Sequence, residues 1–306
     1  EYVWLQKTDI LTLEEIATVV AAFCAVGVDK VRFTGGEPLL RPGVVELVER
    51  LARDSSISDL AMTTNGTQLS RWAPSLRVAG LNRLTISLDT LKSARFEMLT
   101  RRRSLDKVLQ GIRDAAAAGF DGLKINTVVM RDFNDDELVD ILTFGSELGA
   151  QIRFIEYMDV GGATLWSAER VFSKVEILER IENSLGSAEP IGVRGSAPAE
   201  RFRLPDGTVF GVIASTTEPF CRDCDRSRLT ADGLWYHCLY AQEGIELRQL
   251  IRDGNSDELV ATIRRMWESR VDRGAEERFA DPRRTALYQV EELKLDPHRE
   301  MHTRGG

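Results

Sequence analysis

No stretch of the chain has 18 consecutive apolar residues, so the sequence predicts no membrane-spanning helix and no membrane partner. Cysteine is scarce, with four among 306 residues, which fits a reducing compartment and leads us to expect a cytoplasmic protein. Positive charge is not in excess either. The 40 Lys and Arg stand against 48 Asp and Glu, and a net charge of −8 argues against a nucleic acid partner. The length allows one large domain or two smaller ones.

Short apolar runs alternate with helical stretches through the first half of the chain. The five predicted strands are Val31–Thr34, Leu60–Thr63, Arg83–Leu88, Leu123–Met130 and Ile152–Met158. The predicted helices are Leu11–Val28, Gly43–Arg53, Ser70–Ala79, Leu105–Ala118 and Asp135–Leu148. Repeated strand–helix units give a parallel sheet covered by helices, and five strands are fewer than the eight of a closed barrel. We therefore predict an α/β fold in which residues 1–160 form an incomplete TIM-type barrel of parallel strands with outer helices.

The pattern changes after Gly161, so we predict a separate C-terminal region over residues 161–306. Its predicted helices are Phe172–Leu185, Gly244–Arg252 and Asp257–Arg270. Arg201–Leu204 and Val209–Ala214 are typical of a short antiparallel pair around a tight turn. Before this pair, Pro190–Pro198 is rich in Gly, Ser and Pro and indicates a loop, and the final MHTRGG indicates a loose tail.

Three of the four cysteines fall within Phe220–Leu239, as Cys221, Cys224 and Cys238. An odd number without a secretory context argues against disulfides, and three thiolates are the minimum for a soft-metal site. Zinc with His237 as a fourth ligand is an alternative, although neighbouring residues rarely face one metal. We prefer an iron–sulfur cluster held by three cysteines, which leaves one iron open to a substrate.

Two arginines, Arg226 and Arg228, lie between the second and third of these cysteines. A guanidinium group binds phosphate or carboxylate through two parallel hydrogen bonds. The pair therefore predicts an anionic substrate beside the cluster.

Polar residues also follow the predicted strands at their carboxyl ends, where parallel α/β folds bind ligands. In the motif GGEP, Gly36 lets a ligand approach the backbone, and the carboxylate of Glu37 suits a ligand ammonium group. Ser87 lies at the end of the third strand and Met158 at the end of the fifth. Each residue alone has an ordinary explanation as a turn or core residue. Their position at successive strand ends favours a ligand site.

Together these motifs resemble the molybdenum cofactor biosynthesis protein A family, the GTP 3′,8-cyclases of the radical S-adenosylmethionine superfamily. The resemblance runs over essentially the whole chain. It is carried in order by RFTGGEPLLRP, MTTNG, ISLDTL, NTVVMR, RFIEYM, FCRDCDRSRLTADG, HCL and the final GG. GGEP alone occurs across the superfamily, whereas the cysteine stretch with its two arginines and the terminal double glycine make the match specific.

The resemblance implies the radical cyclisation of GTP to (8S)-3′,8-cyclo-7,8-dihydroguanosine 5′-triphosphate, the first step of molybdenum cofactor biosynthesis. It implies two [4Fe-4S] clusters and S-adenosyl-L-methionine as cofactors. The C-terminal region would carry the second cluster. It also implies an electron donor, a functional link to cyclic pyranopterin monophosphate synthase as the next enzyme, and a homodimer.

Individual site residues follow from the same resemblance. Positions that bind S-adenosylmethionine correspond to Gly36, Ser87 and Met158, to which we add Glu37 for its carboxylate. Positions that hold GTP correspond to Arg32, Thr63, Lys124, Arg226, Ser227 and Arg228. The ligands of the second cluster correspond to Cys221, Cys224 and Cys238. A tail that reaches the active site corresponds to Gly305 and Gly306. The expected catalytic residues are Lys124, Arg226, Arg228, Gly305 and Gly306.

The sequence departs from the family in one large respect, because the C-x3-C-x2-C motif of the first cluster is absent. The sequence begins at Glu1, so we expect that upstream residues are missing and that the chain as written is inactive. Cys24 stands alone among apolar residues of a predicted helix and is expected to fill the core. Smaller departures are Asp225, where the family suggests Asn, and Arg304, where it suggests an apolar residue.

Two other functions remain open at this point. Another radical S-adenosylmethionine enzyme with an auxiliary cluster would share GGEP and the partial barrel, but not the arginine pair and the terminal GG. A non-catalytic module that binds a cluster or zinc would fit if Glu1 lies near the natural start.

The cysteine spacing makes a testable prediction about the metal. Protein prepared without air should contain one oxygen-sensitive [4Fe-4S] cluster bound by Cys221, Cys224 and Cys238, measured as iron and sulfide content and by its absorption spectrum. Stoichiometric zinc without iron in such a preparation would contradict the prediction.

Overall fold

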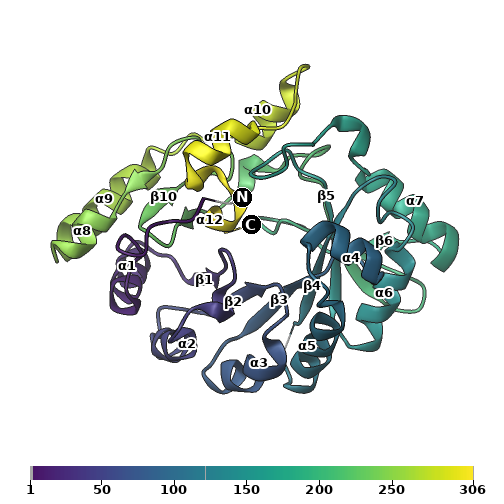
Figure 1. Ribbon diagram of the computed structural model, residues 1–306, viewed down its shortest axis with the longest axis horizontal. Coiled ribbons are helices and arrows are strands. Elements are labelled where there is room, and N and C mark those ends of the chain that lie inside the picture. The colour runs from purple at the N-terminus through teal and green to yellow at the C-terminus, as the bar shows by residue number, and fades with distance from the viewer. Residues whose placement is uncertain (1–2, 121, 306) are drawn as a thin grey trace.

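The computed structural model describes residues 3–120 and 122–305 as an α/β fold built on a mostly parallel sheet (Figure 1). Across these residues the main sheet has the strand order β1-β2-β3-β4-β5-β8-β7-β6. The strands from β1 to β5, and β8 beside β5, run parallel, whereas β7 and β6 are antiparallel additions. The strand bounds are β1 Lys30–Phe33, β2 Asp59–Thr64, β3 Arg83–Ser87, β4 Lys124–Val129, β5 Gln151–Glu156, β6 Glu189–Pro190, β7 Glu200–Arg203 and β8 Val209–Ile213.

Helices cover the outer side of this sheet, with α2, α3, α5, α6 and α7 arranged around the arc of strands in Figure 1. The bounds are α1 Leu13–Ala25, α2 Val44–Ala52, α3 Leu69–Val78, α4 Ser93–Thr100, α5 Leu105–Ala117, α6 Leu138–Glu147 and α7 Lys174–Leu185. Alternate strand residues are apolar and fill the core beneath these helices, among them Met62, Ile86, Ile125 and Phe154. Within the described ranges, no helix combines the length and the apolar character that a membrane crossing requires.

The C-terminal region adds a smaller sheet of order β11-β10-β9 and a group of helices. Its elements are β9 Arg228–Leu229, β10 Leu234–Tyr236, β11 Ile245–Glu246, α8 Arg248–Arg252, α9 Ser256–Glu268, α10 Gly274–Ala280, α11 Val290–Leu295 and α12 Met301–Arg304. A second hydrophobic core joins these elements to α1, because Val19 packs with Trp235 of β10, Ile251 of α8 and Leu259 of α9. The first helix of the chain is therefore part of the C-terminal region's packing.

The structure corrects several of the predicted elements. The predicted helix Gly244–Arg252 is wrong in its first half, because Ile245 pairs with Trp235 in a strand. The pair formed by β7 and β8 is antiparallel as predicted, but β8 also extends the parallel part of the sheet by pairing with β5. The tail is not loose, since Met301–Arg304 is helical. Helices α4, α10 and α11 were not predicted, and their short, charged sequences give little apolar periodicity.

Glu156, the last residue of β5, is a buried carboxylate that joins three segments of the chain. It accepts a hydrogen bond from the backbone N–H of Lys174 at the start of α7, at 2.8 Å. It also accepts from the N–H groups of Thr216 and Thr217, at 2.9 and 2.8 Å, and from Thr217 Oγ1 at 2.5 Å. Four donors therefore satisfy both oxygens of this buried side chain. This arrangement holds the segment that leads into the cysteine stretch against the sheet.

We expect Glu156→Gln to lower the free energy of unfolding by about 2–3 kcal/mol, because an amide nitrogen cannot accept the hydrogen bonds of the oxygen that it replaces. The matched control is Glu49→Gln in α2, which removes an exposed ion pair with Arg53 and should cost less than about 1 kcal/mol. Urea unfolding of the two variants and the native protein, at equal metal content, measures these free energies. If both variants lowered the free energy of unfolding equally, the hydrogen bonds of Glu156 would not be what holds the three segments together.

Candidate functional site

The inner face of the parallel sheet is polar, although a parallel sheet is usually apolar on both faces. On each strand the residues that alternate with the core positions point away from the covering helices. These inward residues include Arg32, Thr63, Arg83, Thr85, Ser87, Lys124, Asn126 and Arg153. The sheet therefore presents a polar surface with four cations toward the inside of its arc.

Two predicted site residues meet on this face. Arg32 Nη1 donates to Thr63 Oγ1 at 3.0 Å and to Thr85 Oγ1 at 3.2 Å, across β1, β2 and β3. Arg32 is exposed to the inner space, yet surrounding protein and the charge of Arg83 lower its pKa to about 10. The Arg32 side chain is both solvent-exposed and surrounded by protein, because it lines the open inner face of the sheet.

The cations on the inner face repel one another, and together with burial this lowers the pKa of Lys124, Arg153 and Arg32. Burial first, and then the charges of Arg153, Arg83 and Arg32, lower the pKa of Lys124 to about 8. Burial and the neighbouring arginines likewise lower the pKa of Arg153 to about 10, and its Nε has no hydrogen-bond partner in the described structure. Asp59 pairs with Arg83. No carboxylate among the described residues pairs with the other three cations. This excess positive charge is suited to an anionic ligand.

The residues predicted to bind S-adenosylmethionine lie at the carboxyl ends of β1, β3 and β5. Gly36 and Ser87 are exposed there, and Met158 is half-buried two residues beyond β5. Glu37 has a structural role that the sequence did not indicate. Its carboxylate accepts hydrogen bonds from the N–H groups of Leu39 and Asn65 and from the Thr64 hydroxyl. These contacts join the GGEP loop to the end of β2 and leave little of the carboxylate for a ligand.

The C-terminal tail runs across this carboxyl edge, and Figure 1 shows α12 inside the arc of strands. At one end Gly161, just beyond β5, lies so close to Met301 that a Cβ would collide with it. At the other end a Cβ on Gly305 would lie 2.5 Å from Thr34 Cγ2, and Gly305 has φ +76°. The structure thus brings Gly305 to the GGEP loop. Gly306 lies outside the described residues, and its role stays a prediction.

Arg304, an unexpected residue in the sequence, anchors this tail. It is only 3% exposed, and its Nη1 donates to the carbonyls of Leu239 at 3.2 Å and Ala241 at 2.5 Å. Its Nε donates to the carbonyl of His298, and its guanidinium lies 4.3 Å from the ring centre of Tyr236. The tail is therefore fastened to the loop that follows Cys238.

Electrostatic interactions link Cys221 with Cys238, and Cys224 and Cys238 each interact with Arg228. Burial raises the pKa of Cys221, with the nearby Cys238 adding to the effect, while N–H groups at the start of α10 oppose it. Burial also favours the neutral thiol of Cys224, but the backbone N–H and guanidinium of Arg226 outweigh this and lower its pKa. Arg226 Nη2 is 3.4 Å from Cys224 Sγ. Gly274, whose missing Cβ would lie 3.2 Å from Cys238 Sγ, leaves room beside that thiol.

Arg228 belongs to the same cluster of side chains. Burial and the charge of Arg226 lower its pKa to about 10, while Cys238 and Cys224 favour its charged form. The structure therefore brings Arg226 and Arg228 close to the cysteines, where their positive charge favours the thiolate form of Cys224.

Cys221, Cys224 and Cys238 supply three thiolate donors, the type of ligand that both iron–sulfur clusters and zinc take. No group of three or more His, Cys, Asp and Glu residues in the described ranges is arranged to hold one metal ion. His237 packs instead against Trp235, at 4.3 Å between ring centres, with Nδ1 3.6 Å from Asp272. Cys24, which we expected in the core, is only partly buried.

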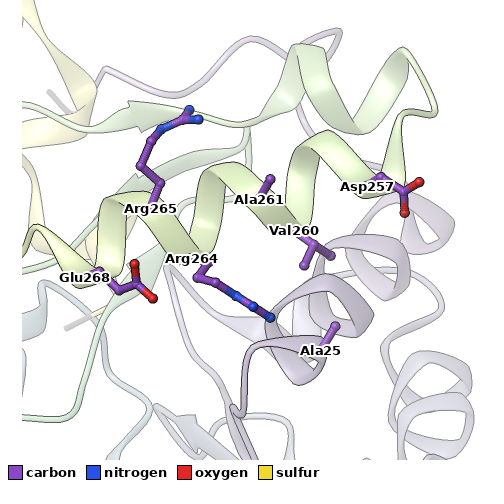
Figure 2. Close-up of a pocket in the computed structure, with 7 residues that line it drawn as sticks. All are labelled: Ala25, Asp257, Val260, Ala261, Arg264, Arg265 and Glu268. Atoms are coloured by element: carbon purple, nitrogen blue, oxygen red, sulfur yellow. The ribbon is translucent and has the colours of Figure 1, made fainter.

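A groove on the surface lies elsewhere and carries none of the predicted residues. It has a volume of about 520 Å³ and lies between the end of α1, at Ala25, and one face of α9, which includes Val260, Arg264 and Glu268 (Figure 2). Its charges are of mixed sign, so it does not share the cationic character of the inner sheet face.

The anchor at Arg304 generates a prediction about the tail. Arg304→Ala should speed hydrogen–deuterium exchange in residues 301–305 and 239–241, because three carbonyls lose their donor and the tail its fastening. Arg304→Lys should restore part of the protection. Arg299→Ala is the control. Arg299 and Arg304 both lie above the ring of Tyr288, at 5.3 and 5.8 Å from its centre, but Arg299 pairs with Glu292 at the surface. Unchanged exchange in the Arg304→Ala tail would show that other contacts hold it.

Comparisons with known families cover most of the chain. Residues 3–145 match the Radical SAM superfamily, and residues 150–276 match Molybdenum Cofactor Synthesis C. In the whole-chain fold comparison, the structure of Streptococcus suis SuiB bound to S-adenosylmethionine has a TM-score of 0.54 at 15% identity, covering 83% of this chain and 60% of that one. This similarity concerns the fold.

Curated relatives are closer in sequence. GTP 3′,8-cyclase 1 of Mycobacterium tuberculosis is 53% identical over 310 residues, which cover 100% of this chain and 86% of the relative. GTP 3′,8-cyclase of Acidothermus cellulolyticus is 44% identical over 288 residues, which cover 92% of this chain and 79% of the relative.

Proposed function

The chain belongs to the GTP 3′,8-cyclase family of radical S-adenosylmethionine enzymes, and from this premise we propose how its residues serve the reaction. The activity is the conversion of GTP to (8S)-3′,8-cyclo-7,8-dihydroguanosine 5′-triphosphate, the first step of molybdenum cofactor biosynthesis. Identity of 53% along the whole chain argues against the two alternatives, a different radical enzyme and a non-catalytic module. A [4Fe-4S] cluster and S-adenosylmethionine, the cofactors of this family, supply the radical chemistry when bound.

The unpaired cations on the inner sheet face carry the proposal for the substrate. Arg32, Lys124 and Arg153 have no carboxylate partner in the described residues, and each has a pKa lowered by burial and by neighbouring positive charge. A triphosphate would neutralise this charge and satisfy the buried Nε of Arg153. Arg153 was missed at the sequence level. Its position in RFIEYM, alternating with the buried Ile152 and Phe154, was the available signal.

Guanine and ribose would then lie toward the carboxyl edge of the sheet. In the proposal Cys221, Cys224 and Cys238 hold a second [4Fe-4S] cluster, and Arg226, Ser227 and Arg228 hold GTP beside it. Arg226 contacts Cys224, and Arg228 lies near both Cys224 and Cys238, which supports this grouping. Positioning of this kind lowers a barrier mainly by fixing the reacting groups.

S-adenosylmethionine would bind along the same edge, at Gly36, Ser87 and Met158. The tail supports this placement, because Gly305 contacts Thr34 immediately before the GGEP motif. We propose that Gly305 and Gly306 close the space between the two ligands and help to exclude water from the reacting atoms.

We further propose that the curved sheet is an incomplete TIM-type barrel and that the regions before and after residue 160 bind different ligands. Residues 1–160 would bind S-adenosylmethionine and the phosphates of GTP, and residues 161–306 would bind the second cluster and the guanine. The sheet itself crosses this boundary, since β8 pairs with β5. The proposal also includes an electron donor, a functional link to cyclic pyranopterin monophosphate synthase and a homodimer. It places the protein in the cytoplasm, whose reducing conditions suit thiolate ligands.

The pKa of Lys124 provides the test. Lys124 is charged below about pH 8 and loses its proton above, while bound phosphate would favour the charged form. Affinity for GTP should therefore be highest below pH 8 and fall as the pH rises through 8 to 9, by up to about tenfold per pH unit, with uptake of a proton on binding. Isothermal calorimetry on anaerobically prepared protein measures both quantities.

The control variant is Lys124→Arg, which stays charged over this range. The difference between its pH profile and that of the native protein separates Lys124 from the titration of guanine itself. Identical profiles for the two proteins, or no GTP binding at any pH, would argue against the proposed phosphate site.

A further inference from the structure

A small cavity opens at the edge of the inner face, beside β5 and β7. It has a volume of about 130 Å³ and is lined by Arg153, Arg194, Arg201, Gly192 and Glu200, among others. Pockets that enclose a whole drug-sized ligand usually measure roughly 300–1,000 Å³, so this cavity fits only part of a ligand. Arg153 connects it to the cations described above, because it lines both the cavity and the inner sheet face.

Strand pairing places two of these arginines opposite each other. Arg153 of β5 pairs with Gly211 of β8, and Gly211 pairs with Arg201 of β7. Gly211 has no side chain to fill the space between them, and a Cβ there would lie 3.5 Å from Arg153 Cγ. The two guanidinium groups are close enough that the charge of Arg201 lowers the pKa of Arg153. Such a pair without a carboxylate between them is unfavourable unless an anion joins them.

The charges around Arg201 do not neutralise it. Glu200, the acidic residue that lines the cavity, is paired with Lys174 at 3.1 Å, on the other side of the strand from Arg201. In the described structure no ion pair involves Arg201 or Arg194. The Arg201 Nη2 atom lies 3.1 Å from the point where a Cβ of Gly192 would be, so the glycine lets the loop approach the guanidinium closely.

Arg194 brings a third cation from the loop between β6 and β7. Its guanidinium lies 4.6 Å from the ring centre of Phe220, and the guanidinium of Arg226 lies 5.3 Å from the same ring. Phe220 immediately precedes the first of the clustered cysteines. The loop is therefore docked on the cysteine stretch, and it carries Arg194 to the cavity rather than into solvent.

We propose that Arg153, Arg194 and Arg201 form a subsite for the terminal phosphates of a nucleoside triphosphate, which makes the enzyme select GTP over GMP. The inference rests on the proposed function, because it takes GTP as the ligand of the inner face, and it goes further by assigning the end of the phosphate chain to this cavity. Arg153 is the residue common to both places, because its charge lowers the pKa of Lys124 and the charge of Arg201 lowers its own pKa.

The test compares nucleotides that differ only in phosphate number. The dissociation constants of GTP, GDP and GMP are measured by calorimetry on anaerobically prepared protein with its cluster assembled. Arg201→Ala and Arg194→Ala should each weaken GTP binding by about 10–100-fold and GMP binding by less than about threefold, since GMP does not reach the subsite. Arg201→Lys should recover part of the GTP affinity.

Arg203→Ala is the matched control. Arg203 lies on the same strand and the same side as Arg201, is exposed and does not line the cavity, so its loss should leave both affinities unchanged. An equal loss of GTP and GMP affinity in the Arg201 variant would indicate a structural role and overturn the subsite. Unchanged GTP affinity in both variants, with normal binding by the native protein, would overturn the subsite alone. Failure of the native protein to bind any guanine nucleotide would overturn the proposed function and the subsite together.

Discussion

Uncompensated positive charge inside the sheet is the constraint on which the rest of the structure depends. Arg32, Lys124 and Arg153 occupy positions that an ordinary parallel sheet gives to Val, Ile or Leu, and their mutual repulsion opposes folding. The outer face offsets this cost, because its strand residues and helices form a continuous apolar core. The outer face of the sheet therefore stabilises the fold, and the inner face presents positive charge to an anionic ligand.

The parts that close the site are fastened by buried polar contacts rather than by a shared apolar core. Asp159, buried just beyond β5, accepts hydrogen bonds from Tyr240 and from the guanidinium groups of Arg278 and Arg284. Together with Arg304 it ties the segment after the third cysteine to both the sheet and the tail. Such contacts require specific geometry, so they fix relative positions in a way that apolar packing alone does not.

Sequence patterns predicted the parallel sheet because apolar runs and helical periodicity repeat strongly through β5. They predicted the cysteine group because cysteine is scarce in this chain, and the arginine pair because it lies between the second and third of these cysteines. They did not reveal Arg153, although it alternates with the buried Ile152 and Phe154, or the structural role of Glu37, whose donors include Thr64 at the end of β2 and the N–H of Asn65. Ile245 was assigned to a helix because a two-residue strand has no period of its own. In each case a contact between distant segments determined the outcome.

The packing of α1 has a consequence for how the chain is made. Glu15 accepts a hydrogen bond from Arg252 at 2.9 Å, 237 positions later, and Leu11 and Val19 are buried against α8 and α9. During synthesis this first helix emerges long before the surface that covers it. Its apolar face stays exposed while the sheet forms, and the second core closes only when the last third of the chain has left the ribosome. Helix α1 is thus translated well before α8 and α9, the helices against which its apolar face is buried.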